Sequence, residues 1–146
     1  MKTVLLAEDV DLLRDMLRDL LESMNIRVLD ASNGAAAIRI GSSHPGKIDL
    51  LLTDVEMGGK SGWEVANEIA RNRPDIRVLY MSGSISRLEW DDYKEKPAGS
   101  HFIQKPFRSE ELKALLMAIF RGVKKADQLG AETSLNLAVA RELNEA

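Results

Sequence analysis

Apolar and polar positions alternate along the chain in two patterns, and together they predict the order of its elements. Short apolar runs bounded by polar or turn residues are typical of buried strands in a parallel sheet. Between these runs, apolar residues recur at three- and four-residue spacing, which predicts amphipathic helices. The expected strands cover residues 3–7, 26–31, 48–54, 76–81 and 101–104.

Capping residues indicate where the helices should begin. Asp11, Ser61 and Ser109 each precede a helical run, and each can accept a hydrogen bond from its first turn. Glu64 lies three residues after Ser61, which completes the pattern of a capping box. The first helix should bury a stripe made of Leu12, Leu13, Met16, Leu17, Leu20, Leu21 and Met24.

Glycine and proline residues predict where other helices end. Asn33-Gly34 opens a small helix, and the run from Gly41 to Gly46 predicts that this helix stops at Ile40. A weaker apolar pattern at residues 85–90 indicates one short helix. The last strong helix should end near Gly122.

Strands that alternate with helices predict parallel pairing through right-handed crossovers. The expected fold is therefore an α/β domain over residues 1–122 with a doubly wound, five-stranded parallel sheet. The strand at 26–31 is less apolar than the others, which favours a position at the edge of this sheet. The tail at 123–146 lies outside the repeat of strands and helices. It has two interpretations: an extra helix, which a thin apolar stripe favours, or a frayed end, which the interruption of that stripe by Gly130 favours.

Composition and charge exclude several classes of protein. The 146 residues suffice for one domain, and the absence of cysteine excludes disulfides and thiolate metal sites. The net charge is −3 and the sequence contains no long basic run, so it lacks the basic stretch that is typical of proteins that bind nucleic acid directly. No apolar stretch approaches the roughly 18 residues of a membrane span, and the N-terminus turns acidic too early for a signal peptide. We therefore expect a soluble, cytoplasmic domain that binds neither nucleic acid nor membranes.

Four of the five expected strands end in polar groups that can meet. The first ends in Glu8-Asp9, the third in Asp54, the fourth in Ser82 and the fifth in Lys105. The carboxyl ends of parallel strands lie along one edge of a sheet, where open α/β sheets bind ligands. At a separation of about 5 Å and an effective dielectric constant of about 20, two carboxylates repel by roughly 3 kcal/mol. Three carboxylates need either a cation or a protonated member, and for a cation the oxygen ligands without His or Cys favour Mg²⁺.

Each of these groups also has an ordinary interpretation. A single aspartate after a strand, such as Asp54, is more often a turn or capping residue than a reactive one. Glu8-Asp9 would then be solvated loop carboxylates, Ser82 a turn hydroxyl and Lys105 a surface ammonium. Their joint occurrence at four strand ends favours a phosphoryl-transfer site, because such a site would use each of them.

The same residues carry a resemblance to a known family. The motifs are Glu8-Asp9, Asp54 followed by Met57 and Gly62, Ser82-Gly83, and Lys105-Pro106-Phe107. Through their order and spacing, the sequence from about residue 2 to residue 121 closely resembles the receiver domain of two-component response regulators. The resemblance implies a CheY-like, flavodoxin-like (βα)5 fold with strand order 2-1-3-4-5.

The resemblance also implies a reaction. Asp54 would accept a phosphoryl group from the phosphohistidine of a sensor histidine kinase or of a phosphotransfer protein. Mg²⁺ would be held by Asp9, Asp54 and the backbone carbonyl of Glu56, with Glu8 acting mainly through water. Lys105 would neutralise charge at the transferred group. Such a domain catalyses its own phosphorylation and dephosphorylation and does not turn over a separate substrate.

The output implied by the resemblance is a switch between two states. Ser82 would donate its hydroxyl to the phosphoryl group, and Phe102 would turn inward to fill the vacated space. The surface of the fourth helix, fifth strand and fifth helix would change with them, and it would bind an unidentified downstream protein or a second copy of the chain. The alternative for Phe102 is an aromatic residue that stays buried in the core.

Three other classes of protein fit the sequence less well. A non-phosphorylated adaptor with a receiver fold has no physical need for the charges at Glu8-Asp9, Asp54 and Lys105. A hydrolase with an aspartate nucleophile would want a second aspartate two residues on, where this chain has Glu56. A flavin site would want a phosphate-binding loop after the first strand, where Glu8-Asp9 would repel phosphate.

Overall fold

The computed structural model describes residues 1–93, 96–124 and 126. The chain divides into two compact units, Met1–Lys105 and Pro106–Ala146. The predicted domain boundary after residue 122 stays a prediction. Nearly all of the predicted tail at 123–146 lies outside the described residues. The first unit contains five strands: β1 (Thr3–Ala7), β2 (Arg27–Ala31), β3 (Leu50–Asp54), β4 (Arg77–Ser82) and β5 (Ser100–Gln104).

These strands form one parallel sheet with the order β2-β1-β3-β4-β5. This order confirms the predicted doubly wound α/β fold and places β2 at an edge. Every residue of β1 and β3 is buried, whereas β2 is largely half-buried. The contrast explains why the apolar runs of β1 and β3 are continuous: both faces of the central strands are covered.

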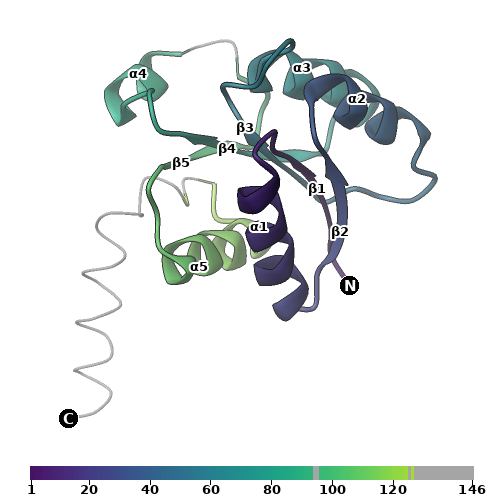
Figure 1. The fold of residues 1–146 in the computed structure, drawn as a ribbon, viewed down its shortest axis with the longest axis horizontal. Helices are drawn as coiled ribbons and strands as arrows, with labels where there is room; N and C mark the ends of the chain where they lie inside the picture. The colour runs from purple at the N-terminus through teal and green to yellow at the C-terminus, as the bar shows by residue number, and fades with distance from the viewer. Residues whose placement is uncertain (94–95, 125, 127–146) are drawn as a thin grey trace. The chain divides into compact units, whose positions relative to one another are not determined.

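Helices cover both faces of this sheet (Figure 1). The helices of the first unit are α1 (Asp11–Ser23), α2 (Gly34–Ser43), α3 (Gly62–Asn72) and α4 (Arg87–Asp92), and α5 (Ser109–Phe120) belongs to the second unit. α1 lies on one face of the sheet, and α2 and α3 lie on the other. No helix in the described ranges is long and apolar enough to cross a bilayer.

The predicted stop of α2 at Ile40 is wrong, because the helix continues through Gly41 to Ser43. Gly41 packs against α3: a Cβ at this position would lie only 3.0 Å from Cγ1 of Ile69. The glycine therefore permits close helix packing and does not end the helix.

Arg73, just after α3, caps the carboxyl end of α2. Its guanidinium donates to the carbonyl of Gly41 at 2.8 Å, of His44 at 2.6 Å and of Gly46 at 2.9 Å. Carbonyls at a helix end lack partners within the helix, so a planar donor with several N–H groups can satisfy them together. This side chain ties α3 to the loop that leads into β3.

The predicted caps are correct for one helix and wrong for two. Ser61 caps α3, since its Oγ accepts the N–H of Glu64 at 3.3 Å. Asp11 is not the N-cap of α1 but its first residue, and it accepts a hydrogen bond from Arg14 at 2.7 Å. Ser109 likewise lies inside α5, whose N-cap is Arg108.

Only part of the predicted apolar stripe of α1 is buried. Leu17 and Leu21 are buried, but Leu12 is 72% exposed and Met16 is 60% exposed. The spacing correctly places these residues on one face of the helix, but only part of that apolar face is covered by the rest of the protein. The helix ends at Ser23, and Asn25, two residues further on, has the positive φ of 61° that is common just past a helix end.

The second unit contains α5. Its buried residues are Leu112, Leu115, Leu116 and Ile119, whereas Phe120 is half-buried. Gly122, two residues past the helix, has a φ of 85°, the left-handed conformation that glycine adopts at helix ends. Its position confirms the predicted end of the last helix.

Candidate functional site

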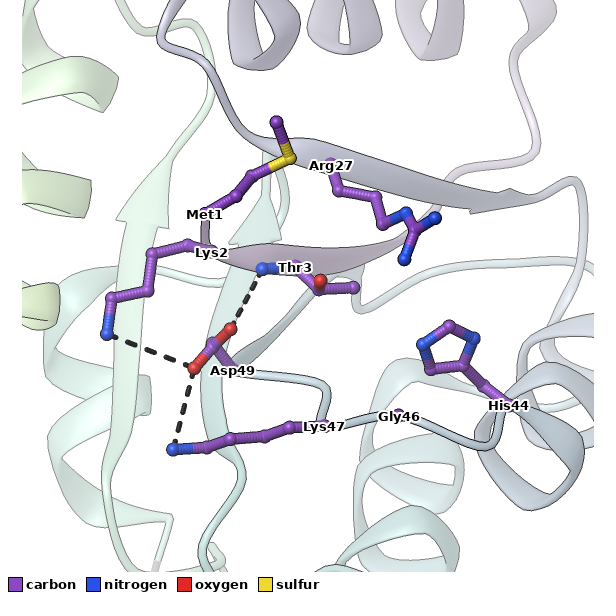
Figure 2. A pocket seen from close by; sticks show the side chains of 8 residues that line it. All are labelled: Met1, Lys2, Thr3, Arg27, His44, Gly46, Lys47 and Asp49. Carbon is purple, nitrogen blue, oxygen red and sulfur yellow. Dashed lines mark hydrogen bonds and ion pairs between the residues drawn. The ribbon is translucent and has the colours of Figure 1, made fainter.

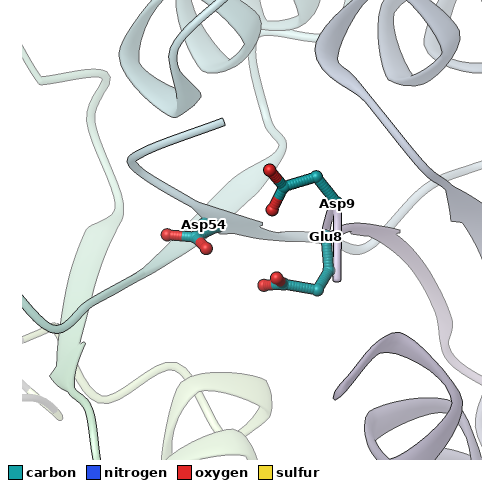
Figure 3. A group of neighbouring side chains, drawn as sticks. All are labelled: Glu8, Asp9 and Asp54. Carbon is teal, nitrogen blue, oxygen red and sulfur yellow. The ribbon is translucent and has the colours of Figure 1, made fainter. Parts of the chain in front are cut away.

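Three carboxylates converge where β1 and β3 end (Figure 3). Glu8 and Asp9 follow β1, and Asp54 is the last residue of β3. One carboxylate oxygen from each lies within 4.8 Å of the other two, and Glu8 and Asp9 point toward Asp54. Glu8 and Asp54 are buried, whereas Asp9 is exposed. The structure therefore brings together the carboxylates that the sequence places at these strand ends.

The turn after β3 holds Asp54 at this edge of the sheet. Val55 donates its N–H to the carbonyl of Met81 at 2.9 Å, and Gly62 donates its N–H to the carbonyl of Val55 at 2.9 Å. A Cβ at Gly62 would collide with the carbonyl oxygen of Asp54. A glycine is therefore needed where the first turn of α3 meets the end of β3.

Lys105, which follows β5, brings a positive charge to the cluster. Its backbone N–H donates to the carbonyl of Ser82 at 2.8 Å, which places it beside the end of β4. Its Nζ donates to Oδ2 of Asp54 at 2.9 Å and lies 3.4 Å from Oε2 of Glu8. Burial alone would lower the pKa of Lys105, but the hydrogen bond and charge of Asp54, with the charge of Glu8, raise it. The ammonium therefore stays charged between two buried carboxylates.

Glu8 is a carboxyl that is difficult to ionise in this environment. Its burial, followed by the charge of Asp54, raises the pKa of Glu8 to about 7, although Lys105 and the N–H of Val10 act in the opposite direction. That N–H donates to Oε1 of Glu8 at 3.2 Å. A single ammonium thus does not fully compensate the two buried carboxylates.

This donor set fits a hard divalent cation. All three groups of the cluster offer carboxylate oxygens, the ligands that Mg²⁺ prefers. After burial, the charge of Asp54 is the next cause of the raised pKa of Glu8 and outweighs the opposing effect of Lys105, so a further cation would relieve this repulsion. Asp9 is exposed, so an ion bound there could keep part of its water shell, as Mg²⁺ usually does in proteins.

Ser82, fully buried at the end of β4, is joined to the cluster through Glu56. Its hydroxyl donates to Oε1 of Glu56 at 2.7 Å, and the hydroxyl of Ser84 donates to the same oxygen. The backbone N–H of Glu56 donates to Oδ1 of Asp54 at 3.2 Å. Burial tends to raise the pKa of Glu56, but the hydrogen bonds from Ser82 and Ser84 outweigh it and lower that pKa. The side chain of Glu56 is therefore an ionised acceptor for two hydroxyls.

Phe102, the predicted switch aromatic, is buried in β5 and stacks on a second aromatic residue. Trp90 of α4 lies over Phe102 with ring centroids 5.3 Å apart, and Trp63 of α3 stacks on Trp90 at 5.9 Å. Tyr80 and Tyr93 pack against Trp63 at 4.4 and 4.2 Å. This aromatic cluster joins α3, α4, β4 and β5. A movement of Phe102 on phosphorylation stays a prediction.

Sequence reasoning missed two polar residues that contact the site. Ser84 donates a hydrogen bond to Glu56. Its position in a turn, two residues after Ser82, could have indicated that it lies near the site. Arg14 of α1 donates to the carbonyl of Glu8 at 2.9 Å and thereby ties the helix to the acidic loop. Arg14 lies one helical turn after Asp11 and forms an ion pair with it, and this spacing could have indicated that Arg14 lies at the start of the helix, beside the acidic loop.

A hollow of about 470 Å³ lies at the amino ends of the strands, away from the acidic cluster at their carboxyl ends (Figure 2). Asp49 accepts the N–H of Thr3 at 2.8 Å and lies 3.6 Å from Nζ of Lys47 and 3.9 Å from Nζ of Lys2. These contacts tie the starts of β1 and β3 and balance the charge of Asp49. The residues that line the hollow include none of the predicted site residues: Met1, Lys2, Thr3, Arg27, His44, Gly46, Lys47 and Asp49.

Comparison with known proteins gives consistent matches. The sequence model of the response regulator receiver domain matches residues 4–117. The response regulator receiver protein CpdR of Brucella abortus is 30% identical over 112 residues, which are 77% of this chain and 91% of CpdR. The sensor kinase CckA of the same organism is 31% identical over 112 residues, which are 75% of this chain but only 12% of CckA.

A solved structure agrees in fold. The response regulator protein TrrA from Thermotoga maritima, in complex with Mg²⁺ and BeF, matches with a TM-score of 0.70 at 28% identity. The match covers 82% of this chain and 99% of that one. The matched sequence model spans most of the chain. The chain therefore belongs to the response regulator receiver domain family.

Proposed function

We propose that Asp54 is the phosphoacceptor of this receiver domain. It would take a phosphoryl group from a phosphohistidine on a sensor histidine kinase or on a phosphotransfer protein. The observation that carries the proposal is the convergence of Glu8, Asp9 and Lys105 on Asp54 at one edge of the sheet. Family membership supports it, because a receiver domain receives its signal in this chemical form.

Contacts to both oxygens of the Asp54 carboxylate support this role. Lys105 holds Oδ2 and the N–H of Glu56 holds Oδ1. A nucleophile fixed before its partner arrives avoids part of the entropic cost of the reaction. In the transfer, a bond forms from an Asp54 oxygen to phosphorus as the phosphorus–nitrogen bond of the donor breaks. The electron pair of that bond stays on the histidine nitrogen.

Mg²⁺ is the cofactor that this proposal requires. Asp9, Asp54 and the backbone carbonyl of Glu56 would hold it, with Glu8 acting mainly through water. The ion would supply positive charge that offsets the repulsion between the carboxylates and an incoming phosphoryl group. The proposal assigns the remaining compensation to Lys105, whose ammonium lies against both buried carboxylates.

The proposed output begins at Ser82. Phosphorylation would add a charge of about −1.5 to −2 and three acceptor oxygens at Asp54. Ser82 would donate to one of these oxygens, and Phe102 would adjust with it. Because Trp90 stacks on Phe102, α4 is the element of the first unit that such a change would reach. The downstream protein, a homodimer and the contribution of α5 to the output surface stay predictions.

A non-phosphorylated adaptor is the less favoured alternative. An adaptor needs a docking surface, and it gains nothing from holding three carboxylates within 4.8 Å of one another. Such a cluster opposes folding unless a cation or a proton compensates it. This energetic argument favours a phosphoacceptor.

Binding of beryllofluoride, a stable analogue of the phosphoryl group, tests the proposal. Fluorine NMR should detect bound fluoride on the wild-type protein only when Mg²⁺ is present. Asp54→Asn should abolish the bound signal. Asp49→Asn, which alters a carboxylate at the amino ends of the strands, should retain it. An equal bound signal on Asp54→Asn would overturn the proposal.

A further inference from the structure

The hydroxyl of Ser82 is fully engaged in this structure. It donates to Oε1 of Glu56 at 2.7 Å. It also accepts the N–H of Ser84 at 3.2 Å and the N–H of Ile85 at 3.0 Å. A serine hydroxyl has one proton to donate and two lone pairs to accept with. The single proton of Ser82 is already donated to Glu56, so the hydroxyl can donate to no second acceptor while that bond lasts. The side chain is also fully buried.

We propose that Glu56 is a positioning residue that opposes the switch, because its carboxylate holds the one proton that Ser82 must donate to a phosphoryl group on Asp54. The inference rests on the proposed function. Ser82 cannot serve both acceptors, so phosphorylation has to break the bond to Glu56. The stability of that bond therefore reduces the affinity of the site for any phosphoryl-like group.

Two contacts strengthen the hold of Glu56 on Ser82. Ser84 donates a second hydroxyl to the same carboxylate oxygen, and the N–H of Glu56 bonds Asp54. Ser84 thus orients the carboxylate, and the bond to Asp54 holds the backbone of the residue that carries it. An ionised acceptor also forms a stronger hydrogen bond than a neutral one.

The same bonds connect Ser82 to the loop before α4. The N–H groups of Ser84 and Ile85 both donate to the Ser82 hydroxyl, so a rotation of this hydroxyl also disturbs the loop backbone. Release of Glu56 would therefore loosen the segment that leads into Trp90 and its stack on Phe102. One carboxylate would restrain both the chemical site and its output.

The competing explanation is simple charge repulsion. Beryllofluoride is anionic, so the negative charge of Glu56 could weaken its binding without any role for Ser82. Two variants separate these causes. Glu56→Gln removes the charge but keeps an oxygen that can accept from Ser82, whereas Glu56→Ala removes both.

The test is calorimetric titration of beryllofluoride at saturating Mg²⁺. Glu56→Ala should bind about tenfold more tightly than wild type, the effect of removing one charge-assisted hydrogen bond from the competing state. Glu56→Gln should gain less than Glu56→Ala. In a Ser82→Ala background, Glu56→Ala should bring no gain, because the proton in question is gone.

Three results would overturn the inference. They are an equal gain for Glu56→Gln and Glu56→Ala, a gain that persists in the Ser82→Ala background, and no gain for Glu56→Ala. Circular dichroism of each variant verifies that it is folded. Failure of the folded wild type itself to bind beryllofluoride would instead overturn the proposed function, and with it this inference.

Discussion

The ammonium of Lys105 donates to Oδ2 of Asp54 across 2.9 Å and joins the end of β5 to the end of β3. Both groups are withdrawn from water, since the side chain of Lys105 is 23% exposed and that of Asp54 is 7% exposed. A charge pair in this setting is screened less than one on the surface. Lys105 therefore contributes strongly to the charge balance of the site, and its removal should lower the rate of phosphorylation.

Lys105→Met should slow phosphorylation at Asp54. The variant keeps an aliphatic side chain but loses the charge, and the loss of one preorganised electrostatic contact costs about 100-fold in rate. The measurement is the rate of adduct formation with a small-molecule phosphodonor at saturating Mg²⁺. Lys47→Met, at the amino ends of the strands, is the matched control and should react like wild type. Equal rates for both variants would contradict the role given to Lys105.

Glu8 should make the stability of the metal-free protein depend on pH. Its pKa is about 7 in the folded state, against an ordinary value of 4.5. The folded protein therefore binds this proton more tightly than the unfolded chain does. The stabilising effect is complete below pH 4.5 and is lost as the pH rises through 7, by roughly 3 kcal/mol in total.

The comparison with Glu8→Gln isolates this effect. Urea denaturation in a chelating buffer should show that the wild type loses stability relative to Glu8→Gln between pH 4.5 and 8. Charges elsewhere in the chain affect both proteins and cancel in the difference. A difference that stays constant over this range would show that Glu8 titrates near its ordinary pKa.

Arg73→Ala should lower the free energy of unfolding by about 2 kcal/mol, because it leaves carbonyls at the end of α2 without their charged donor. Arg71→Ala, two residues earlier at an exposed position of α3, is the matched control and should change stability by less than about 0.5 kcal/mol. Chemical denaturation measures both. Equal losses would mean that the three carbonyl contacts contribute nothing specific.

Trp90 should report the switch through its fluorescence. Its ring is 3% exposed and stacks on Phe102, so a rearrangement that starts at Ser82 should alter its environment. Trp63→Phe leaves Trp90 as the only tryptophan of the chain. In this variant, beryllofluoride with Mg²⁺ should shift or quench the emission. An unchanged spectrum at saturating ligand would indicate that the signal does not pass through Trp90.

The elements and the acidic edge could be predicted because they depend on simple patterns. Continuous apolar runs gave the buried strands, and parallel strands necessarily align their carboxyl ends. Glu8, Asp9, Asp54 and Lys105 therefore had to meet once the fold was known. The cap at Ser61 was predictable for a similar reason, since a local hydrogen bond forms it.

Features that depend on tertiary contacts were not predictable. Gly41 has the sequence signature of a helix stop, but its helix continues because Ile69 packs against it. Asp11 has the signature of a cap, but Arg14 takes its carboxylate. The bond between Glu56 and Ser82 joins residues 26 positions apart, and no local pattern indicates it.

Intact mass after incubation with Mg²⁺ and a small-molecule phosphodonor tests the assignment of Asp54 most directly. The wild-type protein should gain one phosphoryl group, the gain should require Mg²⁺, and Asp54→Asn should gain none. Peptide mapping should place the group on Asp54. A wild type that neither gains the group nor binds beryllofluoride, or an equal gain on Asp54→Asn, would contradict the assignment.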